Sequence, residues 1–154
     1  MAFSHDGWQL ASGSNDNSVW IWDVEMGVPQ PTLEGHTDWV SSVTFTHDGQ
    51  QLVSGSYDNT IRIWDAKAGA LQRILEGHTA WIRSVAFSFN GRWLASGSDD
   101  SIVRIWDVET GVLQWTLKEH IAPVWTVTFS SNKRWLASGS SDSTVWIWDT
   151  KTGH

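Results

Sequence analysis

Short runs that alternate between apolar and polar residues recur along the whole chain. The clearest unit has four such runs, which cover residues 43–46, 51–56, 60–64 and 70–75. The first run reads Val-Thr-Phe-Thr, and this two-residue rhythm is typical of a half-buried strand. Turns separate the runs, as at Asp48-Gly49, where glycine accepts a positive φ at little cost. The pattern predicts four short strands per unit, and no segment shows helical periodicity.

The unit repeats with a constant step along the sequence. Trp-Asp occurs at 22–23, 64–65, 106–107 and 148–149, which is a step of 42 residues. Ser-Gly-Ser occurs at 12–14, 54–56, 96–98 and 138–140, with the same step. Four-stranded units that repeat every forty or so residues indicate a β-propeller, in which each sheet is one blade.

The predicted fold is an all-β propeller segment built from four-stranded antiparallel blades. A four-stranded sheet cannot cover both of its apolar faces by itself, so each blade depends on its neighbours. We expect a single domain, 1–154, whose four blades cover residues 1–34, 35–76, 77–118 and 119–154. The last blade is expected to lack its outer strand, because the sequence stops just after the turn at Gly153. Lys133 stands at the first turn of that blade, where the other blades have glycine.

The repeated residues match the pattern of a known family. In the second unit Gly35-His36 opens the repeat, and Ser54, Asp58 and Trp64 follow. This arrangement extends over essentially the whole chain and resembles the WD-repeat family of β-propellers, which is named after the Trp-Asp dipeptide. The near-identity of the units is also similar to the repetitive propellers of fungal NACHT-type signalling and vegetative-incompatibility proteins.

The resemblance implies a buried, hydrogen-bonded set of His, Ser, Asp and Trp in each blade. The implied residues are His36, Ser54, Asp58 and Trp64 in the second blade, His78, Ser96, Asp100 and Trp106 in the third, and His120, Ser138, Asp142 and Trp148 in the fourth. The first blade keeps Ser12, Asp16 and Trp22 but has no His. A buried indole N–H needs an acceptor, and a serine hydroxyl can both accept and donate, so a structural role follows.

The resemblance also implies a binding surface on the rim around the central opening of the propeller. Its positions lie three and five residues after each His and just before each Asp of the set. The rim candidates are Trp39, Ser41, Tyr57, Trp81, Arg83, Asp99, Trp125 and Ser141. Large aromatic residues beside Arg and Asp are typical of an interaction hot spot. We expect a protein or peptide partner; the alternative is a purely structural or engineered propeller fragment with no ligand of its own.

Ser, His and Asp together also raise the possibility of a hydrolase. Here the set occurs once per blade with Trp as a further member, and no Gly-x-Ser-x-Gly motif surrounds these serines. The histidines of the set lie in different blades, so they form no metal-ligand cluster. We therefore predict no enzyme activity, no catalytic residue, no metal site and no cofactor.

Composition and charge narrow the partners further. Thirteen of the 154 residues are Trp and 18% are charged, which argues against a disordered chain. The formal net charge of −7 disfavours binding to nucleic acid and to anionic membranes. The sequence has no Cys, no signal peptide and no apolar run long enough to cross a membrane. We expect an intracellular, cytoplasmic protein.

Four blades leave two open flanks. Each flank would expose an apolar face, and residues 144–148 would form an unprotected edge. Two chains joined head to tail, first blade against fourth, would close a ring of eight blades, and this homodimer is the favoured expectation. A truncated piece of a longer propeller and a compact four-bladed ring are the alternatives.

Overall fold

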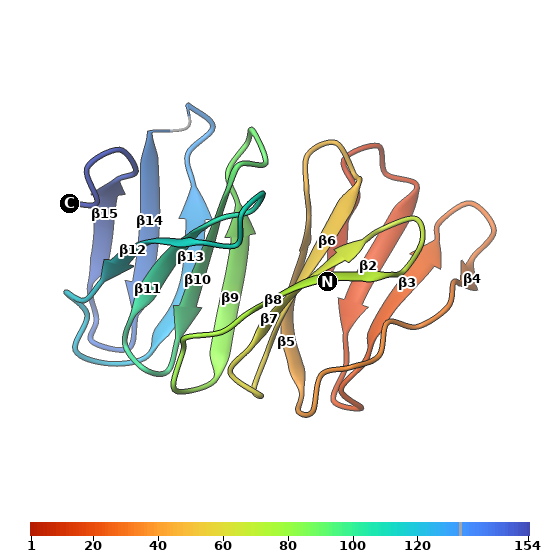
Figure 1. Cartoon of the computed structure of the whole chain (residues 1–154), viewed down its shortest axis with the longest axis horizontal. Helices are drawn as coiled ribbons and strands as arrows, with labels where there is room; N and C mark the ends of the chain where they lie inside the picture. The colour runs from red at the N-terminus through yellow and green to blue at the C-terminus, as the bar shows by residue number, and fades with distance from the viewer. Residues whose placement is uncertain (133) are drawn as a thin grey trace.

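The computed structural model describes residues 1–132 and 134–154, so the turn predicted at Lys133 lies outside the described residues. Strands and turns account for the regular structure, and no helix occurs within the described ranges. The strands form four separate antiparallel sheets (Figure 1). The predicted all-β architecture is confirmed. No helix within the described ranges is long and apolar enough to cross a membrane.

Each sheet is formed by consecutive strands, and we refer to the sheets as blades 1 to 4 in chain order. Blade 1 contains β1 (Ala2–Phe3), β2 (Gln9–Gly13), β3 (Val19–Asp23) and β4 (Val28–Pro29). Blade 2 contains β5 (Val40–Phe45), β6 (Gln51–Ser56), β7 (Ile61–Asp65) and β8 (Leu71–Leu75). Blade 3 contains β9 (Ile82–Phe87), β10 (Trp93–Ser98), β11 (Val103–Asp107) and β12 (Leu113–Leu117). Blade 4 has the predicted three strands, β13 (Val124–Phe129), β14 (Trp135–Ser140) and β15 (Val145–Asp149).

The outer strand of blade 1 is much shorter than those of blades 2 and 3. β4 has only two residues, and Leu33 adds a separate bridge to Val19. Pro29 and Pro31 account for the interruption, because neither has an N–H to donate to β3. Gln30, which lies between them, still donates its N–H to a β3 carbonyl at 2.7 Å. The outer strand of blade 1 is therefore reduced to two fragments.

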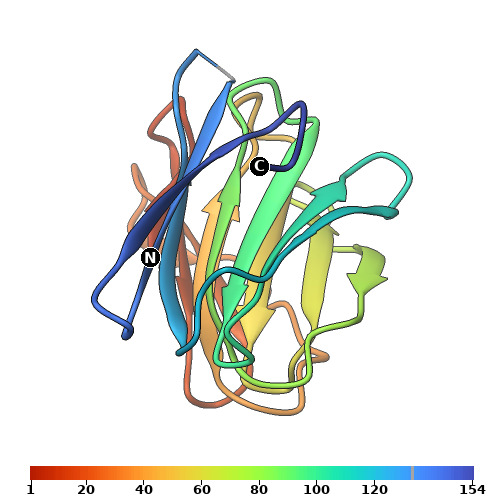
Figure 2. The same ribbon diagram turned by 90° about the vertical axis from the view of Figure 1, so that its left-hand side faces the viewer.

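The blades stack in chain order as an open arc, with blade 1 at one end and blade 4 at the other (Figures 1 and 2). The inner strands β5, β9 and β13 lie side by side. A separate apolar core fills each of the three interfaces between neighbouring blades. Between blades 3 and 4 this core consists of Ala95, Val103, Ile105, Leu117, Val124, Val127, Leu136 and Trp148.

Equivalent side chains in different blades show how much each blade depends on its neighbour. Ile105 of blade 3 is 1% exposed beneath blade 4, whereas the equivalent Ile147 of blade 4 is 64% exposed. Val103 and Val145 differ in the same way, at 0% and 71%. The outer face of blade 4 therefore presents apolar residues to solvent. A groove of about 460 Å³ on this face is lined by Thr128, Phe129, Ser130, Trp135, Ala137 and Ile147.

The glycine of each Ser-Gly-Ser motif lies at a close approach between blades. A methyl group added at Gly55 would lie 2.7 Å from Cγ2 of Ile82 and 3.0 Å from Cγ1 of Val85. These distances are below normal van der Waals contact, so the third blade would have to shift. At the equivalent Gly139 the added methyl would meet only Cγ2 of Thr126, at 3.1 Å. Glycine is thus required where another blade packs against the motif.

We predict that Gly55→Ala lowers the free energy of unfolding by about 1–3 kcal/mol, because it overpacks the interface between blades 2 and 3. Gly139→Ala is the matched control and is expected to cost clearly less. Urea denaturation followed by tryptophan fluorescence measures both changes. Equal losses for the two variants would contradict the proposed role of blade contact.

Candidate functional site

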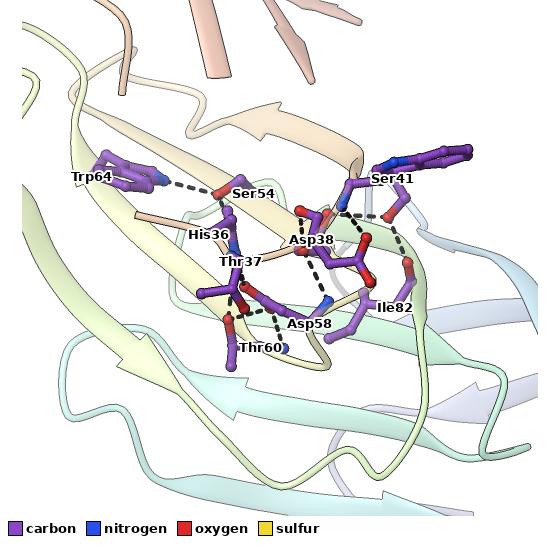
Figure 3. A network of polar contacts seen from close by, with 12 residues as sticks. His36, Thr37, Asp38, Ser41, Ser54, Asp58, Thr60, Trp64 and Ile82 are labelled. Carbon is purple, nitrogen blue, oxygen red and sulfur yellow. Dashed lines mark hydrogen bonds and ion pairs between the residues drawn. The ribbon is translucent and has the colours of Figure 1, made fainter. Parts of the chain in front are cut away.

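A network of polar side chains links the inner part of blade 2 to its loops (Figure 3). His36 Nδ1 lies 2.7 Å from Asp58 Oδ2, and His36 Nε2 lies 2.7 Å from Ser54 Oγ. Trp64 donates its indole N–H to the same serine oxygen at 2.9 Å. Because a carboxylate only accepts, His36 donates from Nδ1, and the Ser54 hydroxyl then donates to Nε2. Each polar atom of this chain of contacts is paired.

The same network occurs in blades 3 and 4. In each blade the His ring lies 2.8 Å from both the Asp and the Ser, and the indole N–H lies 2.9 to 3.0 Å from the Ser. The serines of the three networks are at most 1% exposed. Their residues are His78, Ser96, Asp100 and Trp106 in blade 3, and His120, Ser138, Asp142 and Trp148 in blade 4. Buried and fully paired hydroxyls of this kind are inaccessible to a substrate.

The aspartates of these networks hold two loops together. Asp58 accepts the backbone N–H groups of Thr37 and Thr60 and the hydroxyl of Thr60, at 2.7 to 3.0 Å. Burial alone would raise the pKa of Asp58, but the hydrogen bonds from His36 and Thr60 hold it well below its usual range. Burial also opposes ionisation of Asp100, yet the hydrogen bond and charge of His78 bring its pKa to about 2. Both carboxylates therefore fix the loops that carry the rim residues.

In blade 3 the network has a further member, Arg104, which was not among the predicted site residues. Arg104 Nη1 lies 2.7 Å from His78 Nδ1 and donates to Asp100 Oδ2 at 3.1 Å. Burial lowers the pKa of His78, and the positive charge of Arg104 lowers it further, against the hydrogen bond to Asp100. The only sequence signal was that Arg62 and Arg104 occupy the same repeat position, where blades 1 and 4 have Trp.

Blade 1 has a reduced version of the network. Trp22 Nε1 lies 3.5 Å from Ser12 Oγ, which is longer than in the other blades. Asp16 is exposed and accepts hydrogen bonds from its near neighbours Ser18 and the backbone of the same turn. Without a His, Ser12 and Asp16 are not linked. The first network therefore does not tie a loop to the sheet.

Three aromatic rings of the predicted rim form a row across blades 2 and 3. Trp39 stacks on Tyr57 with ring centroids 5.9 Å apart, and Tyr57 stacks on Trp81 at 4.3 Å and 4°. Arg83 lies over this row, with its guanidinium carbon 5.0 Å from the Tyr57 ring and 5.2 Å from the Trp81 ring. It also lies 4.9 Å from the ring of Trp125, which belongs to blade 4. Residues of three blades thus meet at one place.

Arg83 is held in this position by directed hydrogen bonds. Its Nε and Nη2 atoms donate to the two oxygens of Asp99, each at 2.7 Å, and Nη1 donates to the hydroxyl of Tyr57 at 2.5 Å. The hydrogen bond to Asp99 raises the pKa of Arg83 above its usual value. The guanidinium charge is thus balanced within the site. The exposed parts of Trp39, Trp81 and Trp125 form the surface available to a partner.

The remaining rim candidates separate into two groups. Trp125 donates its indole N–H to Ser141 Oγ, so these two residues lie with the aromatic row. Ser41 instead lies 3.0 Å from the carbonyl oxygen of Gly55 and 2.5 Å from that of Ile82 (Figure 3). Its hydroxyl is engaged by the backbone of two blades, which is a role in blade contact. We call the other seven candidates the aromatic rim: Trp39, Tyr57, Trp81, Arg83, Asp99, Trp125 and Ser141.

The aromatic rim is exposed although it is ordered by its own contacts. Trp39, Trp81 and Trp125 are 48%, 45% and 56% exposed. Amphipathic rings that are held rigid lose little entropy when a partner covers them, and they dominate many protein interfaces. Among the described residues, no three His, Asp or Glu side chains gather in a way that could hold a metal ion. The contacts seen at the rim are ring stacking and hydrogen bonds.

Repeated antiparallel sheets of three or four strands, three of which contain a buried His, Ser, Asp and Trp network, define a propeller of the WD type. The family model for the WD domain, G-beta repeat, matches residues 1–23, 27–65, 69–107 and 111–149. The chain belongs to the WD-repeat family. From residue 27 onward, each match begins near the outer strand of one blade and ends on the third strand of the next blade. One sequence repeat therefore contributes strands to two consecutive blades. Membership of this family indicates a protein-interaction scaffold.

Three curated relatives match short stretches of the chain. Ribosome assembly protein 4 of Chaetomium thermophilum is 53% identical over 36 residues, or 23% of this chain and 7% of that protein. The probable serine/threonine-protein kinase PkwA of Thermomonospora curvata is 55% identical over 40 residues, or 26% and 5%. The APC/C activator protein CDC20 of Saccharomyces cerevisiae is 43% identical over 44 residues, or 29% and 7%. The matched stretches thus span less than a tenth of each relative, about one repeat.

We predict that Ser54→Ala lowers the free energy of unfolding by about 1–3 kcal/mol, because it leaves buried groups of His36 and Trp64 without their partner. Ser12→Ala in blade 1 is the matched control and is expected to cost less, since no His depends on that hydroxyl. Thermal and urea unfolding of both variants measure the difference. A loss at Ser12 as large as that at Ser54 would argue against the network.

Proposed function

We propose that the chain is a non-catalytic scaffold that binds a peptide or protein segment across the aromatic rim. The observation that carries this proposal is the stacked row of Trp39, Tyr57 and Trp81, to which Arg83 joins the exposed ring of Trp125. The buried serines of the networks offer no nucleophile to a substrate. Family membership supports the same conclusion, because WD-repeat domains generally mediate protein interactions.

The physical basis of binding is the combination of rigidity and exposure. Arg83 is fixed by Asp99 and Tyr57, so a partner would not have to immobilise it. The rings of Trp39, Trp81 and Trp125 offer apolar faces with polar edges, which suits an extended peptide with alternating apolar and polar groups.

We also propose that two copies associate head to tail through their flanks. The exposed residues Val145 and Ile147 of blade 4 occupy positions that are buried beneath a neighbour in blades 2 and 3. At the other end of the arc, Trp22 of blade 1 is only partly buried, whereas the equivalent Trp64 is 2% exposed. The two faces therefore have the same residue types as the contacts already formed within the arc. A second copy of blade 1 is the proposed occupant of the groove on blade 4.

We predict that replacing both Trp39 and Trp81 by Ala abolishes peptide binding. The test selects random 12-residue peptides displayed on phage against the wild-type protein and measures the best of them by calorimetry. Each lost ring is expected to cost about 2 kcal/mol, or roughly 30-fold in Kd. Trp8→Ala is the control, because Trp8 is also exposed, at 57%, but lies in the β1–β2 turn away from the rim. Selection of no peptide would favour a structural scaffold without a ligand, and unchanged binding by the double variant would exclude the rim.

We predict that sedimentation equilibrium gives twice the chain mass of 17.3 kDa and that Ile147→Asp returns the monomer. Ile147 is exposed within one chain, so an aspartate there leaves the three internal cores intact but places a charge in the proposed contact. Ile74→Asp on β8 is the control, since Ile74 is also exposed, at 41%, and lies outside the flank. A monomeric wild-type protein would exclude this mode of association.

A further inference from the structure

A polar cleft lies between blades 2 and 3 at the edge opposite the aromatic rim, beside the β5–β6 and β9–β10 turns (uppermost in Figure 1). Its volume is about 650 Å³, and a second hollow of about 320 Å³ adjoins it through shared residues. The residues common to both are Asp48, Gln51, Asn90 and Gly91. The combined space is large enough for several linked rings of a small ligand.

A difference between otherwise similar repeats opens this cleft. Blades 3 and 4 have Trp93 and Trp135 where blade 2 has Gln51. Trp93 packs against the core between blades 3 and 4, and Arg92 covers its ring at 4.7 Å. Gln51 is smaller, and its amide instead donates to the side chain of Gln72 at 2.7 Å. The space that Trp93 fills in blade 3 is therefore open in blade 2.

The walls of the cleft offer both donors and acceptors. Asp48 and Asp65 each use Oδ1 to accept backbone N–H groups of their own turns. Within the described part of the chain, Oδ2 of each carboxylate accepts no hydrogen bond. The side-chain amides of Gln50 and Gln72 also line the cleft, and an amide can donate and accept at once. Such a wall is complementary to hydroxyl groups, which also donate and accept.

Aromatic rings stand at the mouth of the smaller hollow. His47 and Phe89 lie with ring centroids 4.4 Å apart, and Phe89 is 50% exposed. His5 continues the row, 3.8 Å from His47. These three residues occupy the same position in blades 1, 2 and 3, at the first turn of each. Of the three rings, those of His47 and Phe89 line the smaller hollow and form its aromatic part, next to the hydrogen-bonding wall.

We infer that this cleft binds a short neutral oligosaccharide. Sugar rings present hydroxyl groups at their edges, which the amides and carboxylates of the cleft can bind, and C–H groups on their faces, which pack on aromatic rings. An anionic ligand would meet Asp48, Asp65 and Glu109, and among the described residues Arg92 is the one cationic side chain that lines the cleft. An apolar ligand would leave the amides and carboxylates unpaired. This inference is independent of the proposed role of the aromatic rim.

Titration of the ¹⁵N-labelled protein with cellotetraose, laminaritetraose, maltotetraose and N-acetylated chitotetraose tests the inference. We expect saturable shifts of the side-chain amide signals of Gln50, Gln51 and Gln72 with at least one of these sugars. Gln51→Trp, which introduces the residue found in blades 3 and 4, is expected to weaken binding at least 10-fold. Gln9→Trp, the same substitution in blade 1, is expected to leave binding unchanged.

A second pair of variants keeps the test independent of folding. Gln72 and Gln114 occupy equivalent, exposed positions on β8 and β12, and only Gln72 lines the cleft. Gln72→Leu is expected to weaken sugar binding, and Gln114→Leu is expected to have no effect. The absence of binding by all four sugars, or equal binding by both members of each pair, would overturn the inference. Binding of tetralysine at the cleft in place of the sugars would also overturn it and would identify a cation site.

Discussion

Contact between the apolar faces of neighbouring blades is the interaction on which this structure depends. A sheet of three or four strands is too thin to bury its own side chains, and apolar burial is the main favourable term in folding. The isoleucine at the same position is almost fully buried in blade 3 and largely exposed in blade 4. The polar networks add to this stacking, because they tie His36, in the loop before β5, to Ser54 on β6, which also accepts a hydrogen bond from Trp64 on β7.

Much of the fold could be predicted from the sequence because the same pattern of strand and turn residues occurs in all four repeats. The step between Trp-Asp dipeptides gave the size of a blade, and the alternation within it gave the strands. The networks were implied by family resemblance rather than by spacing, and the structure brings those residues together in blades 2, 3 and 4. The short outer strand of blade 1 follows from Pro29 and Pro31, whose effect on length was not anticipated.

Other parts of the sites could not be predicted because they depend on how the blades are placed relative to one another. In the sequence, Arg104 is not distinguished from other polar residues of a strand, and only the structure places it beside His78. Ser41 is exposed, and its hydroxyl also donates to backbone carbonyls of two blades, a contact that the repeat pattern does not indicate. The row of His5, His47 and Phe89 combines three turns that are far apart in sequence. Periodicity reports the face of a strand, but not which side chains meet across an interface.

The position of Arg83 has a geometric consequence for the whole arc. Its side chain contacts Tyr57 of blade 2, Asp99 of its own blade and the ring of Trp125 in blade 4, so three successive sheets share one guanidinium. The distance between sheets on the inner side of the arc, relative to the outer side, sets its curvature. Curvature in turn decides how many sheets complete a circle. A single side chain therefore contributes to the curvature of the arc.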